Sequence, residues 1–239
     1  MSAVTRMSNH GVDAEDVEGH EGHRQRLRRR FLTAGPEALA DYELLELLLF
    51  LARPRGDVKP LAKRLVARFG SFAGAISADP SDLAKVDGMG EVSVAALKTA
   101  KAAADRLLGQ PLMNRPVLSG WQALLDYCHA ALAHLPVEVV RVLYLDRKNR
   151  LIQDEAQGRG TVDHTPLYPR EVVKRALDLG ASALIVVHNH PSGDPTPSEA
   201  DIRVTNQLKD AAAALGIVLH DHIIVGRQGH TSFRATGLL

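Results

Sequence analysis

The chain has 239 residues, of which 45% are hydrophobic, a net charge of +1 and a single cysteine, Cys128. One cysteine excludes an internal disulfide, and the absence of a long uninterrupted apolar run argues against a membrane span. Acidic residues stand where a signal peptide would be basic and then apolar, so we expect a globular cytoplasmic protein of one or two domains.

Charge is unevenly distributed along the chain. Residues 1–22 are polar and mainly acidic, and we predict that they form a disordered tail. Residues 22–110 hold 15 basic and 10 acidic side chains, whereas residues 111–239 hold 13 of each. The surplus of basic residues permits a polyanionic partner, although a solvated charged face is the simpler explanation.

Residues 23–108 show helical periodicity. "LADYELLELLLFLA" at 39–52 predicts a leucine-rich helix with Asp41 as its N-cap, and "DVKPLAKRLVARFG" at 57–70 predicts a second helix ending at Gly70. "VDGMGEVS" then places Gly88 and Gly90 between two further helical segments. These patterns predict a compact, all-helical domain.

The pattern changes after "GQPLMNRP" at 109–116, which we interpret as an interdomain linker. Strands and helices then alternate, which predicts an α/β or α+β domain over 117–239, with helices packed on a mixed sheet. The predicted helices are 121–134, 168–180 and 199–215, and the predicted strands lie within 137–146, 151–156, 182–190 and 217–226.

A metal-ligand pattern follows the buried strand "SALIVVHNH". His188 and His190 are two residues apart, so both project from the same face of an extended chain, and Asp201 follows in the first turn of a helix for which Ser198 is the predicted N-cap. Two imidazoles and one carboxylate leave a fourth tetrahedral position open, as catalytic zinc sites do. We therefore predict that His188, His190 and Asp201 bind one Zn²⁺.

Such a site has further chemical requirements. Zinc lowers the pKa of a bound water to about 7, and a nearby carboxylate must take up the water's proton and return it to the leaving group. A donor must also face the developing oxyanion, and Ser198 is our candidate for that donor.

The spacing H-x-H-x7-S-x2-D, formed by His188, His190, Ser198 and Asp201, resembles the JAMM motif of MPN-domain metallopeptidases. The longer string "HNHPSGDPTPSEAD", with "PREVVKRAL" before it and "DHIIVG" after it, resembles the RadC family of bacteria, and the resemblance extends over nearly the whole chain from residue 23. It implies an MPN domain, a cytidine-deaminase-like mixed sheet flanked by helices, preceded by a helix–hairpin–helix domain. It also implies a link to DNA repair.

JAMM proteins carry a general-base glutamate on an earlier strand, and by resemblance this is Glu138 in "PVEVVRVLYLD". Glu155 and Glu171 are rivals by residue type. Many JAMM peptidases have Ser or Thr between the two histidines, where this chain has Asn189, as is typical of the RadC branch. We expect Asn189 to face away from the metal and to affect metal binding little. HNH nucleases spread their residues over a ββα unit, so the letters "HNH" do not indicate one.

A second H-x-H, His220 and His222, serves as an internal comparison. No S-x2-D follows it, and Asp221 between the two histidines should face the other way. We interpret this pair as structural, or as a set of contacts behind the metal ligands.

The glycine pair of the helical domain resembles a helix–hairpin–helix motif, whose backbone N–H groups bind a DNA phosphate. On this interpretation Gly88 and Gly90 form the hairpin, and Lys98 and Lys101 add salt-dependent attraction. Asp87 and Glu91 beside the hairpin weaken that case, and a structural or protein-binding hairpin is the alternative.

Three functions remain open. The first is a zinc metallohydrolase of the peptidase or isopeptidase type, acting on a protein or peptide. The second is a non-catalytic DNA-binding module in which the metal is structural. The third is a metal-dependent nuclease, which is disfavoured because the sequence has no evident second carboxylate cluster for a two-metal site.

Overall fold

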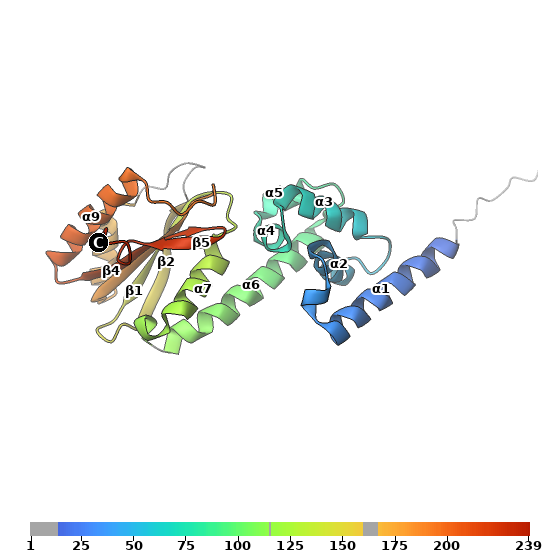
Figure 1. Ribbon diagram of the computed structural model, residues 1–239, viewed down its shortest axis with the longest axis horizontal. Coiled ribbons are helices and arrows are strands. Elements are labelled where there is room, and N and C mark those ends of the chain that lie inside the picture. Colours follow the sequence, from blue (N-terminus) through green and yellow to red (C-terminus); the bar gives the residue numbers. More distant parts are fainter. Residues whose placement is uncertain (1–13, 115, 160–166) are drawn as a thin grey trace, which may run out of the picture. The chain divides into compact units, whose positions relative to one another are not determined.

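The computed structural model describes residues 14–114, 116–159 and 167–239 of the chain. The chain divides into two compact units, Met1–Lys98 and Thr99–Leu239 (Figure 1). None of the helices among the described residues has the length and apolar character needed to cross a bilayer.

The first unit is helical. Its elements are α1 (Ala14–Ala34), the 3₁₀ turn η1 (Pro36–Ala38), α2 (Asp41–Ala52), α3 (Lys59–Phe69), α4 (Phe72–Ser77), α5 (Pro80–Ala84) and the first part of α6 (Glu91–Asn114). Leucines of α2 and α3 form the core with Leu83 and Leu97. Gly70 ends α3 at φ 83°, as its position in the sequence predicts.

Two details of this unit correct the sequence analysis. The tail predicted over 1–22 is helical from Ala14 onward, and the rest of it lies outside the described residues. Asp41 is the first residue of α2 and not its N-cap, because its carboxylate accepts a hydrogen bond from the Phe72 N–H at the start of α4 (2.8 Å). Glu43 caps α2 instead, accepting from the Ala40 N–H at 3.0 Å.

The predicted linker at 109–116 is also mostly helical, because α6 continues to Asn114. Gly109 and Pro111 cost a helix about 1 and 3 kcal/mol relative to alanine, which is why the segment is predicted as a linker, but the helix continues through both. The division between the compact units falls at Lys98, ten residues before the predicted domain boundary at 108.

The second unit contains a five-stranded sheet in the order β2-β1-β3-β4-β5. Only β3 and β4 pair in parallel; the other neighbours are antiparallel. The remaining elements of the unit are η2 (Val117–Gly120), α7 (Trp121–Leu132), β1 (Val139–Leu145), β2 (Leu151–Arg159), α8 (Pro169–Asp178), β3 (Ala183–Asn189), α9 (Glu199–Ala213), β4 (Val218–Gly226) and β5 (Gly229–Ser232). This is the mixed sheet with helices that the alternating pattern predicts.

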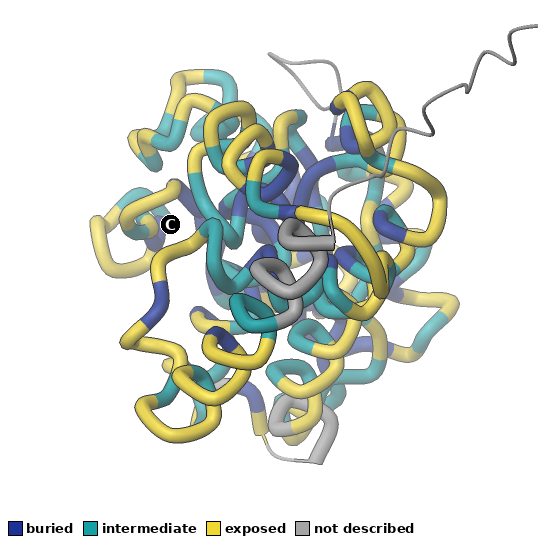
Figure 2. The backbone as a smooth tube through the Cα atoms, turned by 90° about the vertical axis from the view of Figure 1, so that its right-hand side faces the viewer, coloured by how far each residue is buried: buried dark blue, intermediate teal, exposed yellow. Residues whose placement is uncertain are grey.

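Helices cover both faces of the sheet, α7 on one and α8 with α9 on the other (Figure 1). Side chains of the central strand β3 alternate between these faces: Ile185 and Val187 pack with α7, whereas Leu184 and Val186 pack with α8 and α9. In the chain as a whole, the exposed segments lie mostly on the outside of the tube, around buried ones (Figure 2). Every residue of β3 is buried. The strand therefore delivers its last residues to a fixed position.

Candidate metal centre

The candidate centre lies where β3 ends and α9 begins. Between them, the loop at 190–198 is tied to β4 by a hydrogen bond from the His190 N–H to the Val225 carbonyl (3.1 Å). Gly226 permits this crossing, because a Cβ there would lie 2.3 Å from the Gly193 carbonyl oxygen. Gly193 itself turns at φ 93°, in the region that favours glycine. Loop and strand end are thereby packed backbone against backbone.

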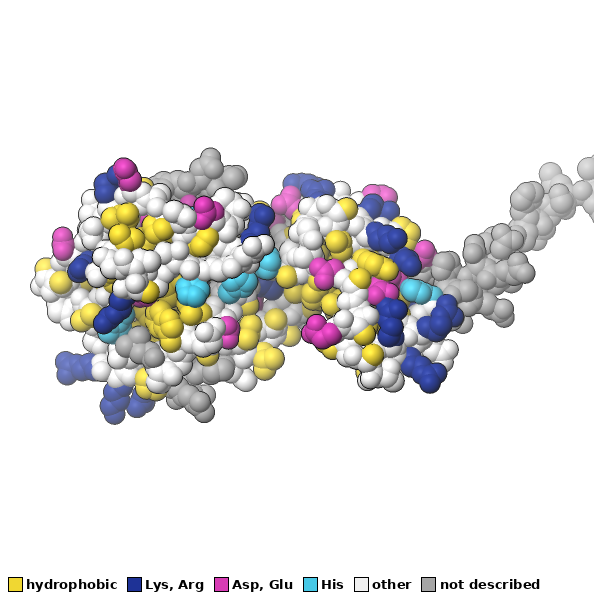
Figure 3. Space-filling model, in the orientation of Figure 1, with side chains coloured by type: hydrophobic (Ala, Val, Ile, Leu, Met, Phe, Trp, Pro, Cys, Tyr) yellow, Lys and Arg dark blue, Asp and Glu magenta, His cyan; other side chains and the backbone are white. Residues whose placement is uncertain are grey.

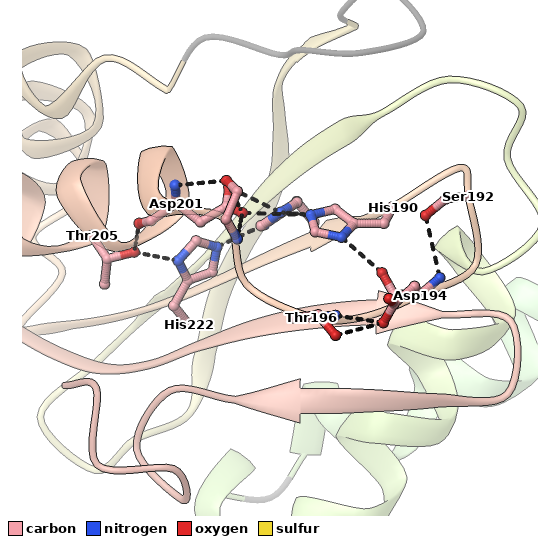
Figure 4. Close-up of polar contacts among 9 residues, drawn as sticks. His190, Ser192, Asp194, Thr196, Asp201, Thr205 and His222 are labelled. Carbon is pink, nitrogen blue, oxygen red and sulfur yellow. Dashed lines mark hydrogen bonds and ion pairs between the residues drawn. The ribbon is translucent and has the colours of Figure 1, made fainter.

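Three predicted ligands converge across this junction. The Nε2 atoms of His188 and His190 are 3.1 Å apart, and they lie 3.4 and 3.5 Å respectively from the two carboxylate oxygens of Asp201. Among the described residues, this is the one group of three or more His, Cys, Asp or Glu side chains that could hold a metal ion. Figure 4 shows His190 and Asp201 approaching from the loop and from α9.

A chain of hydrogen bonds fixes the protonation of His188. Thr205 Oγ1 lies 2.5 Å from both the Asp201 main-chain carbonyl and His222 Nδ1, and His222 Nε2 lies 2.8 Å from His188 Nδ1 (Figure 4). The carbonyl only accepts, so Thr205 donates to it and must accept from His222 Nδ1–H. The Nε2 of His222 then accepts from His188 Nδ1–H, which leaves the Nε2 of His188 with a free lone pair.

Burial keeps both of these rings neutral. It lowers the pKa of His188 to about 4, outweighing the attraction of the Asp201 carboxylate, and lowers the pKa of His222 well below its usual value. Both side chains are only 2% exposed. A neutral imidazole with its Nε2 lone pair turned toward a carboxylate is the form that binds a metal.

His190 is oriented in the same sense by a different partner. Its Nδ1 lies 2.8 Å from the main-chain carbonyl of Asp194, which accepts only, so Nδ1 carries a proton and Nε2 is directed at the centre. The Asp194 carboxylate is held by the Thr196 backbone N–H and hydroxyl at 3.0 and 2.7 Å (Figure 4). The neighbouring Asp201 carboxylate raises the pKa of His190 despite burial, so the centre favours a positive charge beside Nε2, which a proton or a metal ion can supply.

Asp201 is preorganised by the start of α9. The Ser198 hydroxyl and backbone N–H donate to its Oδ2 at 2.6 and 2.8 Å, and Ser198 Oγ accepts from the Asp201 N–H at 3.2 Å. Burial on its own would raise the pKa of Asp201, but the adjacent imidazoles of His190 and His188 and the two hydrogen bonds from Ser198 hold it below its usual range. Ser198 is therefore the N-cap of α9, as predicted. Its role as a donor to the oxyanion stays a prediction.

These three groups fit a cation. Two imidazole lone pairs and one carboxylate meet without a donor among them, and like-signed electron density so close requires a metal ion or a shared proton. Ligand atoms about 2.0–2.2 Å from a tetrahedral zinc lie roughly 3.3–3.5 Å apart. The two Nε2 atoms are 3.1 Å apart, and each lies 3.4 or 3.5 Å from a different Asp201 oxygen, so the three groups surround a space close to that size.

A cavity of about 320 Å³ adjoins two of the predicted ligands, and Glu138 lines it together with His188 and Asp201. Its remaining walls include the apolar Val140, Leu167 and Val204 and the polar Arg203 and Gln207. Glu138 immediately precedes β1, whose Val140 pairs with His188 of β3. The sheet register therefore brings the predicted acid/base residue to the cavity that His188 and Asp201 line.

Neither rival glutamate lines this cavity. Glu155 forms a bidentate ion pair with Arg175, and that hydrogen bonding lowers its pKa. Glu171 is half-exposed and pairs with its neighbour Arg170 at 2.9 Å. By position, Glu138 is the glutamate that is available to the centre.

The sequence predicted that His220 and His222 are structural or lie behind the metal ligands. In the structure the two histidines have different surroundings. His220 Nε2 bonds Asn149 Oδ1 at 2.7 Å, whereas His222 lies directly behind His188. Asp221 faces elsewhere and accepts from the Ser232 hydroxyl. Thr205 was not predicted at all, because nothing in its sequence context distinguishes it from an ordinary residue of a helix.

The proposed DNA contacts of the helical domain are arranged differently from expectation. Gly88 turns at φ 87° in the exposed hairpin before α6, as predicted, and Gly90 is exposed beside it. Lys98, however, donates to the main-chain carbonyls of residues 76–78 at 2.9–3.3 Å and so caps the end of α4. Lys101 is largely buried in an ion pair with Asp105. Two arginines approach the hairpin instead: Arg53 donates to the Gly88 carbonyl and Arg64 to that of Asp87.

Comparison with known proteins agrees with this division of the chain. Residues 118–238 match the model of the RadC-like JAB domain, and residues 21–95 match that of the UPF0758 N-terminal family. A UPF0758 protein of Rhodobacter capsulatus is 65% identical over 213 residues, covering 89% of this chain and all of the relative. A UPF0758 protein of Ruegeria pomeroyi is 58% identical over 217 residues, covering 91% and 97%. The chain therefore belongs to the RadC family.

Proposed function

We propose that the chain is a zinc-dependent metallohydrolase of the peptidase or isopeptidase type. One observation carries the proposal: His188, His190 and Asp201 present converging electron pairs beside a cavity that Glu138 also lines. The protonation of both histidines is set by acceptors on their far sides. A zinc ion held there lowers the pKa of a bound water to about 7.

The protein's own groups then have separate tasks. His188, His190 and Asp201 hold the ion, and each is oriented by a partner outside the centre. Glu138 accepts a proton and returns it to the leaving group. Val140, Leu167 and Val204 give the cavity an apolar wall that suits a side chain of a peptide substrate.

Hydrolysis of a carbonyl compound is favoured over phosphodiester cleavage. The described residues contain one three-ligand group, whereas many nucleases use two metals about 3.5–4 Å apart. Plasmid nicking that disappears in Asp201→Ala would instead support the nuclease alternative.

Zinc content tests the centre. Purified wild-type protein should contain one equivalent of zinc, and the double variant His188→Ala, His190→Ala should contain none. His220→Ala is the matched control, because His220 belongs to the second H-x-H pair and contacts Asn149 away from the ligands. Unchanged zinc in the double variant would contradict the site.

Turnover tests the chemistry. In a screen of peptide and isopeptide substrates, Glu138→Gln should keep its zinc and lose activity by at least about 100-fold, the lower end of the range for acid/base groups. Glu171→Gln should leave both unchanged, because Glu171 lies half-exposed beside Arg170. Full activity in zinc-loaded Glu138→Gln would remove Glu138 from the mechanism.

A second candidate function, contact with DNA through the helical unit, is favoured by the two arginines at the hairpin. Their guanidinium groups hold the carbonyls of Asp87 and Gly88, and both arginine side chains are exposed. Figure 3 shows further Lys and Arg side chains on the visible face of this unit, interspersed with acidic ones. Positive side chains around an exposed glycine turn suit a phosphate backbone.

Titration of a labelled duplex at several salt concentrations tests this candidate. The affinity should fall as the salt concentration rises. The double variant Arg53→Gln, Arg64→Gln should bind more weakly, and the slope of log affinity against log salt should decrease by about one or two, as expected for the loss of one or two phosphate contacts. Arg170→Gln, an exposed arginine of α8, is the control. A salt-independent signal, or no binding at low salt, would defeat the candidate.

A further inference from the structure

We infer that Asn189, the residue between the two histidine ligands, is a positioning residue for Glu138. This inference rests on the proposed acid/base role of Glu138. It concerns how the protein fixes the backbone from which that carboxylate projects.

The carboxamide of Asn189 binds both peptide groups that flank Glu138. Its Oδ1 accepts from the Val139 N–H at 2.9 Å, and its Nδ2 donates to the Val137 carbonyl at 3.0 Å. The first group belongs to the peptide that follows the Glu138 Cα, and the second to the peptide that precedes it. One side chain therefore restrains the two backbone torsions of Glu138.

This restraint is placed where the sheet no longer supplies one. Strand β1 begins at Val139, and its ladder with β3 pairs Val140 with His188, so Glu138 lies just outside the ladder. The ends of strands fray most easily, because opening there breaks the fewest contacts. The Asn189 side chain extends the pairing of β3 with the chain before β1 by one further step.

The chemistry of the contact requires an amide. One partner is an N–H and the other a carbonyl, so the side chain must accept and donate at once, and this also settles which end of the carboxamide is oxygen. A carboxylate would turn an oxygen toward the Val137 carbonyl, and an aliphatic side chain would leave both peptide groups without partners. Asn189 is fully buried, so water cannot replace either bond.

Asn189 thus couples the two halves of the centre. Its neighbours His188 and His190 project toward the ligand cluster, while its own side chain is directed at the backbone around Glu138. Two successive residues of β3, His188 and Asn189, therefore position the metal ligand and the backbone of Glu138 relative to each other.

The first test is structural and needs no substrate. Asn189→Leu keeps nearly the same volume but removes both hydrogen bonds, and in zinc-loaded protein it should speed amide hydrogen exchange at Val139 by at least about 10-fold, as expected for one lost hydrogen bond. Exchange at Val186, inside the ladder, should change much less. Asn206→Leu, at an exposed position of α9, is the control. Unchanged exchange at Val139 would overturn the inference.

The second test is kinetic. Asn189→Leu should retain one equivalent of zinc and a KM within about 2-fold, while kcat falls about 10- to 100-fold, as expected for a misplaced catalytic group. In a Glu138→Asp background the same substitution should cost much less, because the carboxylate is already displaced. Equal costs in both backgrounds, or a loss of zinc that accounts for the lost rate, would contradict a positioning role.

Two further variants keep these tests decisive. If Asn189→Leu does not fold, Asn189→Ser, which retains one hydrogen-bonding group, should give an intermediate kcat and intermediate exchange; a wild-type kcat there would also count against the inference. If Glu138→Gln leaves turnover intact, it is the proposed function that fails. The exchange at Val139 then still decides whether Asn189 restrains the backbone.

Discussion

At the scale of single residues, the protonation of the candidate ligands His188 and His190 is decided by groups outside the three-residue centre. Thr205 has one hydroxyl proton and gives it to a carbonyl, and this dictates the tautomer of His222 and through it that of His188. The spacing of the ligands was predictable from the sequence, because H-x-H and S-x2-D are local patterns. The partners behind them were not, since Thr205 and His222 lie 17 residues apart and meet only in the folded chain.

Thr205→Val should weaken zinc binding. Valine has a similar shape but no hydroxyl, so His222 Nδ1–H loses its acceptor, and His188 is no longer held in the metal-binding tautomer. Loss of such an outer contact typically costs 10- to 100-fold in metal affinity, which a competition titration with a chromophoric chelator would measure. Thr33→Val, at an exposed position of α1, should have no effect. Wild-type affinity in Thr205→Val would show that the tautomer is set by something else.

At the scale of elements, side chains satisfy the ends of neighbouring helices and strands. Asp41 holds the start of α4 and Lys98 its end. Helical periodicity predicted the existence of these helices, but it assigned Asp41 to the N-cap of its own helix, and the resemblance to a helix–hairpin–helix motif gave no indication that Lys98 caps α4. Both assignments depend on which elements become neighbours in space, and a local pattern carries no such information.

Lys98→Met should destabilise the helical unit by about 2 kcal/mol, because three carbonyls at the end of α4 lose a charged donor. Urea denaturation followed by far-UV circular dichroism measures the change. Lys85→Met removes only an exposed pair with Asp82 and should cost less than about 0.5 kcal/mol. If Lys98→Met had normal stability but reduced DNA affinity, the result would contradict the capping role and support the predicted contact of Lys98 with DNA.

Gly226→Ala should displace the loop that carries His190. The new Cβ would lie 2.3 Å from the Gly193 carbonyl oxygen and 2.8 Å from Pro195 Cδ, so the loop must move, at a cost of about 1–3 kcal/mol in stability together with weaker zinc binding. Calorimetry and zinc titration report the two effects. Gly229→Ala, three residues away, meets no atom within 4 Å and provides the control. Equal behaviour of the two variants would mean that the loop is not held by this close approach.

At the scale of the whole chain, the sequence predicted two domains and the class of each fold correctly. A helical unit precedes a mixed sheet covered by helices, and the two family matches at 21–95 and 118–238 follow the same division. The division at Lys98 and most of the predicted linker both fall on α6, which runs from Glu91 to Asn114 without a break. The sequence composition changes within this region, but the secondary structure does not, because one helix continues through it.

Removal of zinc should affect the two units unequally. A ligand that binds only the folded state stabilises it by about 4 kcal/mol at a thousandfold excess over its Kd. Chelation should therefore increase hydrogen exchange in β3 and β4, where the centre lies, and leave exchange in α2 and α3 nearly unchanged. The zinc-free His188→Ala, His190→Ala protein should not respond to the chelator. A uniform response over both units would argue that zinc does not bind at this centre.

The alternation of side chains along β3 limits how this protein can vary over evolution. Inserting or deleting one residue between Ala183 and His188 would rotate the end of the strand by half a turn. The histidines would then face α7, and Asn189 would take their place opposite α9. Length changes are therefore expected to accumulate in the exposed turn at 146–150, and a natural relative with an altered β3 length should have lost both histidines as well.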